Sequence, residues 1–170
     1  MGGGGYPVFN ISGGLKELER IGREQIRRSI ERPPRRRVFL SFRGEDKNLV
    51  DEFRKRAKDQ KSPLDFIDFS LVVPFRSENA EYIRRGIRER IKNCSVTIVL
   101  VGETTYQSEW VDWEIRESEK LGKGIVAVKL VDPVVKPKAL EDLGIELLPM
   151  DDKIISRAIQ EAAEKRRDNT

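Results

Sequence analysis

Hydrophobic residues follow two alternating patterns from residue 37 to the end of the chain. Short runs that are apolar nearly throughout, of which 95–101 (SVTIVLV) is the clearest, are typical of parallel strands covered on both faces. Between these runs, apolar residues recur at spacings of three and four, as in 79–93, which is typical of amphipathic helices. The predicted strands are 38–42, 66–71, 95–101, 124–131 and 145–148, and the predicted helices are 48–60, 79–93, 109–121 and 151–165.

This alternation predicts an α/β fold of three layers, in which helices cover both faces of a five-stranded parallel sheet. The expected strand order is 2-1-3-4-5, the flavodoxin-like arrangement. Ligands of such sheets bind beyond the carboxyl ends of the strands, near the point where the strand order reverses. We therefore expect the chemistry in the loops that follow the first three strands.

The first 35 residues differ in character from the rest of the chain. Residues 1–14 are dominated by glycine and are expected to be irregular, whereas 15–31 place apolar residues near one face of a helix. Pro33 and Pro34 end this predicted helix. We predict a leader with an N-terminal amphipathic helix (1–35) and one folded domain (36–167). The pattern leaves open whether the helix covers the domain or binds a partner.

The charge of the chain is concentrated in this leader. Of the 170 residues, 38% are hydrophobic and 36% are charged, a balance typical of a globular protein. The net charge is +4, and residues 1–37 contribute +5 of it, so the remainder carries −1. No aromatic residues alternate with the arginines, which favours a solvated arm over nucleic-acid binding. No apolar run approaches the roughly 20 residues of a membrane span and no secretory signal is present, so a cytoplasmic protein without membrane contact is expected.

The chain contains no histidine and a single cysteine, Cys94. The lack of histidine removes the commonest general base and every Ser-His-Asp triad. With only one cysteine, no transition-metal site is expected, and a lone thiol fits a reducing compartment. Catalysis would have to rest on carboxylates, hydroxyls, backbone amides or a bound cofactor.

The loop after the first predicted strand, 42–46, reads FRGED. Its single glycine does not match the dinucleotide-binding G-x-G-x-x-G, and the chain contains no P-loop. The loop also lacks the hydroxyl groups of a flavodoxin phosphate loop, and the third strand lacks the terminal aspartate of a phosphoacceptor receiver domain. For Arg43, binding of a phosphate and a structural role are equally compatible with the pattern. Glu45 and Asp46 are better explained by the dipole of the following helix.

The helix predicted at 109–121 opens with SEWVDWEI, in which Trp110 and Glu114 are four residues apart and share a face. Such pairs are common in helices. Spacing alone therefore favours Trp110 as a packing anchor and Glu114 as a solvated residue.

Two stretches resemble one family. RRVFLSFRGED (36–46) resembles the opening strand and loop of Toll/interleukin-receptor-like (TIR-like) domains, and NCSVTIVLVGETTYQSEWVDWEI (93–115) resembles their third strand and following helix. The intervening stretch has the length and order of the family, with its second-strand loop at 72–79. The resemblance covers about 36–131 and is greatest to the bacterial TIR-like proteins of Thoeris antiphage defence.

In NAD-cleaving members of this family, a Trp-x-x-x-Glu arrangement carries the catalytic glutamate, so the resemblance implies that Glu114 is catalytic and that Trp110 contacts the substrate. It further implies that Phe42 and Arg43 flank the nicotinamide and its phosphates, and that the loop containing Phe75 completes the pocket. The stretch 72–77 lacks the family's usual glycine. Whether this loop closes over the substrate or takes part in assembly is therefore left open.

The expected function is that of an NAD glycohydrolase or cyclase that uses NAD as substrate, needs no further cofactor or metal, and produces a nucleotide signal for a downstream effector. A homo-oligomer is among the expected partners, because neighbouring copies often complete such pockets. The alternative is a non-enzymatic protein–protein interaction module. A third class, a flavin protein, would be yellow.

Overall fold

The computed structural model describes residues 11–31, 35–70 and 79–165, and the chain divides into two compact units, 1–34 and 35–170. In the first unit, α1 (Ile11–Glu31) exposes Leu15, Leu18 and Ile26. The expectation of irregular backbone was wrong for 11–14, where α1 begins. Glycines in a first turn cost least, because the N–H groups there have no helical partner. None of the described helices is long and apolar enough to span a membrane.

In the second unit, five parallel strands form one sheet in the order β2-β1-β3-β4-β5, which confirms the predicted order. Every side chain of β3 is buried, as predicted for a central strand. The strands are β1 (Arg36–Ser41), β2 (Phe66–Asp68), β3 (Val96–Val101), β4 (Gly124–Lys129) and β5 (Leu147–Leu148). The helices are α2 (Lys47–Lys58), α3 (Ala80–Lys92), α4 (Glu109–Lys120), α5 (Lys138–Asp142) and α6 (Asp152–Lys165), with 3₁₀ turns η1 (Gly44–Asp46) and η2 (Thr105–Gln107).

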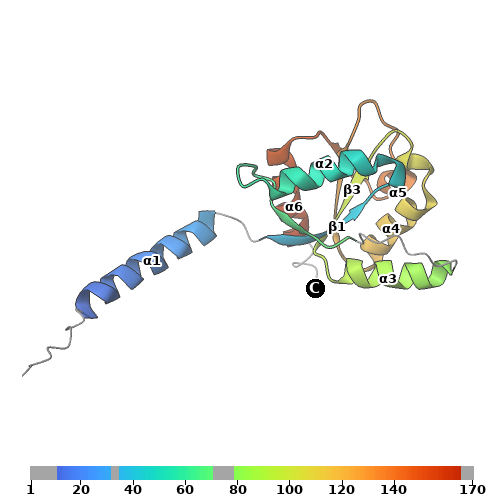
Figure 1. The fold of residues 1–170 in the computed structure, drawn as a ribbon. Coiled ribbons are helices and arrows are strands. Elements are labelled where there is room, and N and C mark those ends of the chain that lie inside the picture. The colour runs from blue at the N-terminus through green and yellow to red at the C-terminus, as the bar shows by residue number, and fades with distance from the viewer. Residues whose placement is uncertain (1–10, 32–34, 71–78, 166–170) are drawn as a thin grey trace, which may run out of the picture. The chain divides into compact units, whose positions relative to one another are not determined.

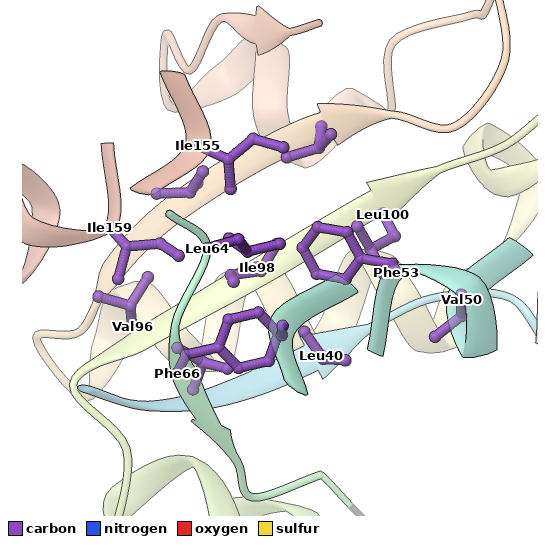
Figure 2. Close-up of a cluster of buried hydrophobic side chains, with 14 of the residues drawn as sticks. Leu40, Val50, Phe53, Leu64, Phe66, Val96, Ile98, Leu100, Ile155 and Ile159 are labelled. Carbon is purple, nitrogen blue, oxygen red and sulfur yellow. The ribbon is translucent and has the colours of Figure 1, made fainter. Parts of the chain in front are cut away.

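The helices cover both faces of this sheet, as Figure 1 shows. On one face, α2 and α6 bury apolar side chains such as Phe53 and Ile155 against the strands (Figure 2). The rings of Phe53 and Phe66 stack there with their centroids 5.5 Å apart. On the other face, α4 and α5 bury Ile115 and Leu140, and α3 packs beside them in a third cluster. The predicted three-layer fold is confirmed.

Several predicted boundaries were wrong. β2 ends at Asp68 rather than at residue 71, which lies outside the described residues. At the end of the strand, the Asp68 carboxylate accepts hydrogen bonds from the backbone N–H of Ser70 at 2.9 Å and from Nε of Arg54 at 2.6 Å. β5 has two residues instead of four. The short helix α5 lies in a stretch for which no helix was predicted.

Gly124, the first residue of β4, lies directly against α6. A Cβ at this position would lie 2.5 Å from the carbonyl oxygen of Ala162, which is backbone and has no room to move. We expect Gly124→Ala to lower the free energy of unfolding by about 1–3 kcal/mol. Urea denaturation measures this, with Gly44→Ala as the control because a Cβ on Gly44 would meet nothing within 4 Å. Equal stability of the two variants would contradict the close approach of α6 to β4.

Candidate active site

Glu114 lies on α4, and its carboxylate accepts a hydrogen bond from the hydroxyl of Ser41. Ser41 is the last residue of β1 and is fully buried. The two residues are 73 positions apart in the chain. Their contact places the Glu114 carboxylate at the carboxyl end of the sheet, where ligands of this architecture bind.

The position of Glu114 follows from how α4 is held against β3. The helix begins at Ser108, whose hydroxyl accepts a hydrogen bond from the backbone N–H of Val111 at 3.2 Å. Further along, the hydroxyls of Ser118 and Thr97 are 2.7 Å apart in a buried hydrogen bond. The Ser118 hydroxyl also donates to the backbone carbonyl of Glu114 at 2.7 Å. This chain of hydroxyls fixes the turn that carries the candidate carboxylate.

The electrostatics of Glu114 are those of a carboxyl group withdrawn from water. The side chain as a whole keeps some solvent contact, but burial of its carboxyl group raises its pKa from 4.5 to about 7. The hydrogen bond from Ser41 opposes that shift, because it stabilises the ionised form. A carboxyl group with a pKa near 7 is typical of a functional site.

Alternation along β1 decides which side chain faces Glu114. Leu40 joins the core beneath α2 and α6, and Phe42 packs against that same core with the guanidinium of Arg54 5.3 Å from its ring centroid. Ser41 is on the opposite face, towards α4. The structure thus places Ser41 beside Glu114, and Phe42 across the sheet from it. Sequence reasoning missed Ser41, although this alternation would have identified it. The contact of Phe42 with nicotinamide stays a prediction.

The loop after β1 is tied to the loop after β3. Nη1 of Arg43 donates to the backbone carbonyl of Thr104 at 2.9 Å, and Nη2 lies 3.3 Å from the carboxylate of Glu45. The Thr104 hydroxyl also donates to Glu45 at 3.1 Å. Arg43 thus has a bracing role in this structure, and phosphate binding by Arg43 stays a prediction.

Asp46 braces the same two loops. It is the N-cap residue of α2, yet its side chain makes no capping hydrogen bond. Instead, the Thr105 hydroxyl donates to it at 3.4 Å, and a Cβ on Gly102 would lie 2.2 Å from its carboxylate. Burial raises the pKa of Asp46. The sequence analysis explained Glu45 and Asp46 by the dipole of α2. In the structure their side chains also contact the loop after β3.

Trp110 lies one helical turn before Glu114 and is 40% exposed. Its ring meets that of Trp113 edge to face, with the centroids 6.1 Å apart. Arg84 of α3 adds a guanidinium 5.5 Å from the Trp110 centroid.

The interpretation from spacing alone was wrong for Glu114, because its carboxyl group is buried and it is not a solvated helix residue. The catalytic role of Glu114 and the substrate contact of Trp110 stay predictions. Phe75 and the rest of 71–78 lie outside the described residues.

Other features of the second unit are less suited to catalysis than Glu114. Burial raises the pKa of Cys94 to about 12, so the thiol stays protonated and is a poor nucleophile. Among the described residues, no cluster of three or more His, Cys, Asp or Glu side chains could hold a metal ion. A groove of about 430 Å³ runs along β4, β5 and α6, but neither Ser41 nor Glu114 lines it. The candidate site is therefore defined by Glu114.

Comparison with known proteins identifies relatives at three levels. The family model described as "Thoeris protein ThsB, TIR-like domain" matches residues 39–132. A protein of Bacillus cereus (strain MSX-D12), named "Putative cyclic ADP-D-ribose synthase ThsB1", is 30% identical over an alignment 102 residues long, which covers 56% of this chain and 52% of that protein. This chain thus spans about half the length of that relative.

Among solved structures, a Clostridium botulinum CMP N-glycosidase, BcmB, is similar at a TM-score of 0.49 and 14% identity, covering 73% of this chain and 98% of that one. The TIR domain of the Toll-related receptor TRR-2 from Hydra magnipapillata is similar at a TM-score of 0.47 and 18% identity, covering 76% and 97%. Likeness at this level says nothing about activity.

The family match begins inside β1 and continues beyond β4, so it contains both stretches that resemble TIR-like domains almost entirely. It includes the Ser41 and Glu114 contact as well as the loops braced by Arg43. More than half of the chain is matched, and the sheet has the strand order that the alternation of strands and helices predicted. This chain belongs to the Thoeris ThsB family of TIR-like domains.

Proposed function

We propose that this chain is an NAD glycohydrolase or cyclase that releases nicotinamide and produces an ADP-ribose-type nucleotide signal in bacterial antiphage defence. The observation that carries the proposal is the Glu114 carboxylate, withdrawn from water and hydrogen-bonded to Ser41 at the carboxyl end of the sheet. The name of the Bacillus cereus relative, a cyclic ADP-D-ribose synthase, supports the same class of substrate.

The chemistry needs only one carboxylate. The bond between the nicotinamide nitrogen and the ribose carbon breaks, and its electron pair leaves with nicotinamide, which becomes neutral. Positive charge then develops on the ribose carbon, as in glycoside hydrolysis. An ionised Glu114 stabilises this charge or orients the ribose hydroxyls. Nicotinamide is a good leaving group already, so no histidine and no strong general acid are required.

The product depends on what attacks the ribose carbon. Addition of water, with loss of its proton, gives ADP-ribose. Attack by a nucleophile of the same molecule, such as its adenine, gives a cyclic nucleotide. Either product would act as the signal for a downstream effector. We expect a second copy of the chain to complete the pocket, because neighbouring copies often complete such pockets in oligomers.

The test follows NAD and its products by chromatography, using the purified full chain at several protein concentrations and cells that express it. We expect release of nicotinamide with ADP-ribose or a cyclic product from the wild-type chain, and increasing specific activity with concentration if copies complete the pocket. Glu114→Gln serves as the control for contaminating enzymes. NAD loss that is equal for both proteins, in solution and in cells, would overturn the proposal.

A second candidate is a non-enzymatic interaction module, and α1 is the observation in its favour. Leu15 and Leu18 are exposed apolar side chains of α1, and an apolar helix face of this kind is commonly covered by a partner or by another part of the protein. This candidate predicts that Leu18→Glu abolishes protection of cells against phage whereas Glu114→Gln does not. The reverse result would favour the enzyme.

A further inference from the structure

Arg84, on α3, has its guanidinium beside both indole rings of α4. Its Cζ lies 5.5 Å from the ring centroid of Trp110 and 5.6 Å from that of Trp113. The two helices are neighbours on the same face of the sheet (Figure 1). Contacts with aromatic rings position a cation without neutralising its charge. The side chain is therefore held in place and still fully charged.

The hydrogen-bonding groups of Arg84 are unused within the described ranges. In residues 35–70 and 79–165 it makes no ion pair and no hydrogen bond, and its Nε is buried without a partner. One turn later on α3, by contrast, Nε of Arg88 donates to the carboxylate of Glu117 at 2.7 Å. Leaving the buried N–H donor of Arg84 unpaired is costly. The arrangement therefore calls for an anion from outside these residues.

The position of Arg84 suggests which anion this is. Trp110 contacts Arg84 directly and lies four residues before Glu114, so the two side chains start about 5–6 Å apart on one helix face. In a dinucleotide, the diphosphate is attached to the same ribose whose carbon would react at Glu114. A guanidinium beside Trp110, the residue one helical turn before Glu114, can bind a phosphate with two parallel hydrogen bonds.

We propose that Arg84 binds the diphosphate of the nucleotide substrate, at a site formed together with the exposed ring of Trp110. The identity of the ligand rests on the function proposed above. The anion site itself rests on the unpaired guanidinium. Its neighbourhood attracts anions, because α3 carries five arginine and lysine residues and only two glutamates.

The two tryptophans of the chain, Trp110 and Trp113, both contact Arg84, so intrinsic fluorescence reports binding at this site. The experiment titrates ADP-ribose into full-length Glu114→Gln protein, which prevents turnover. We expect an added Arg84→Gln substitution to weaken binding of ADP-ribose about 10- to 100-fold, because charge-assisted hydrogen bonds are lost. Adenosine, which has no phosphate, should bind equally to both proteins.

Two further variants separate binding from folding. Arg85→Gln, an exposed neighbour on α3, removes the same charge and should leave ADP-ribose binding within about twofold of the parent. Arg84→Lys keeps the charge beside the rings but loses the planar fork, so a smaller loss is expected, and its melting temperature should match the parent. If Arg84→Gln fails to fold, the ADP-ribose affinities of Arg84→Lys and Arg85→Gln are compared instead. A loss of affinity in Arg84→Lys but not in Arg85→Gln then supports the site.

Unchanged ADP-ribose affinity in folded Arg84 variants would overturn the inference, and so would equal losses for Arg84→Gln and Arg85→Gln. The outcome is separable from that of the proposed function. If the wild-type chain leaves NAD intact while ADP-ribose affinity depends on Arg84, the catalytic proposal fails and the anion site stands. If NAD is consumed and Arg84 makes no difference to affinity, this inference alone fails.

Discussion

Replacing Glu114 with glutamine is expected to slow NAD cleavage about 10²- to 10³-fold, the loss typical when a group that stabilises a charged transition state is removed. Glutamine has the same shape and can still accept a hydrogen bond from Ser41 through its amide oxygen. It cannot carry the negative charge that the developing ribosyl cation requires. The rate of nicotinamide release under saturating NAD measures the effect.

The same substitution is expected to stabilise the fold at pH 8. Burial raises the pKa of Glu114 from 4.5 to about 7, so the folded chain binds this proton more tightly than the unfolded chain does. The contribution of Glu114 to the free energy of unfolding therefore falls as the pH rises from about 4.5 to about 7, and stays low above that range. Glutamine removes this penalty, for a gain of about 1–3 kcal/mol at pH 8 and little at pH 5.

A matched control is Glu109→Gln, since Glu109 lies on the same helix and is exposed. It should change neither the NAD cleavage rate nor the urea midpoint appreciably. Loss of activity together with a gain of stability is the signature of a functional carboxylate held in an unfavourable place. A Glu114→Gln protein that is inactive and also less stable at pH 8 would mean that Glu114 serves the fold.

Much of the fold was predictable because its signals are local. The continuous apolar run of β3 and the periodic spacing of α3 identify their elements without knowledge of their neighbours. α5 was missed for the opposite reason. It has only five residues, and the backbone N–H of Ala139 at its start is satisfied by the carboxylate of Asp112 on α4 at 3.1 Å. A contact between residues 27 positions apart leaves no local pattern.

The site was predictable only in part, for the same physical reason. The family resemblance singled out Glu114 where spacing alone favoured a solvated residue. The hydrogen-bond partner of its carboxyl group is Ser41 on β1, which is distant in sequence. Arg84 was missed because α3 contains several arginines, and the sequence pattern does not distinguish one of them from the others. Only its contacts with Trp110 and Trp113, and its lack of a carboxylate partner in the described ranges, set it apart.

The rate of NAD cleavage at low substrate is expected to fall about tenfold for each pH unit below about 7, because only the ionised Glu114 is active and burial raises its pKa to about 7. Between pH 8 and pH 5 the loss approaches 100-fold. The measurement is kcat/KM against pH, which reports the pKa of the free enzyme. A rate that is flat from pH 5 to pH 8 would contradict the assignment.

Ser41→Ala should move this inflection to higher pH, because the Ser41 hydrogen bond lowers the pKa of Glu114 and its removal leaves burial unopposed. Ser95→Ala, at the amino end of β3, is the matched control and should leave the inflection in place. A purely structural role of Ser41 would lower the rate at every pH without moving the inflection.

An inflection near pH 7 can be assigned to Glu114 because the chain contains no histidine, the side chain that ordinarily titrates between pH 5 and pH 8. The Cys94 thiol, with a pKa of about 12, does not ionise there either. An inflection near pH 7 in cleavage by the wild-type chain, absent from the residual activity of Glu114→Gln, therefore identifies the buried carboxyl group as its source. If the inflection persisted in that variant, another ionisation, such as that of the α-amino group, would control the rate.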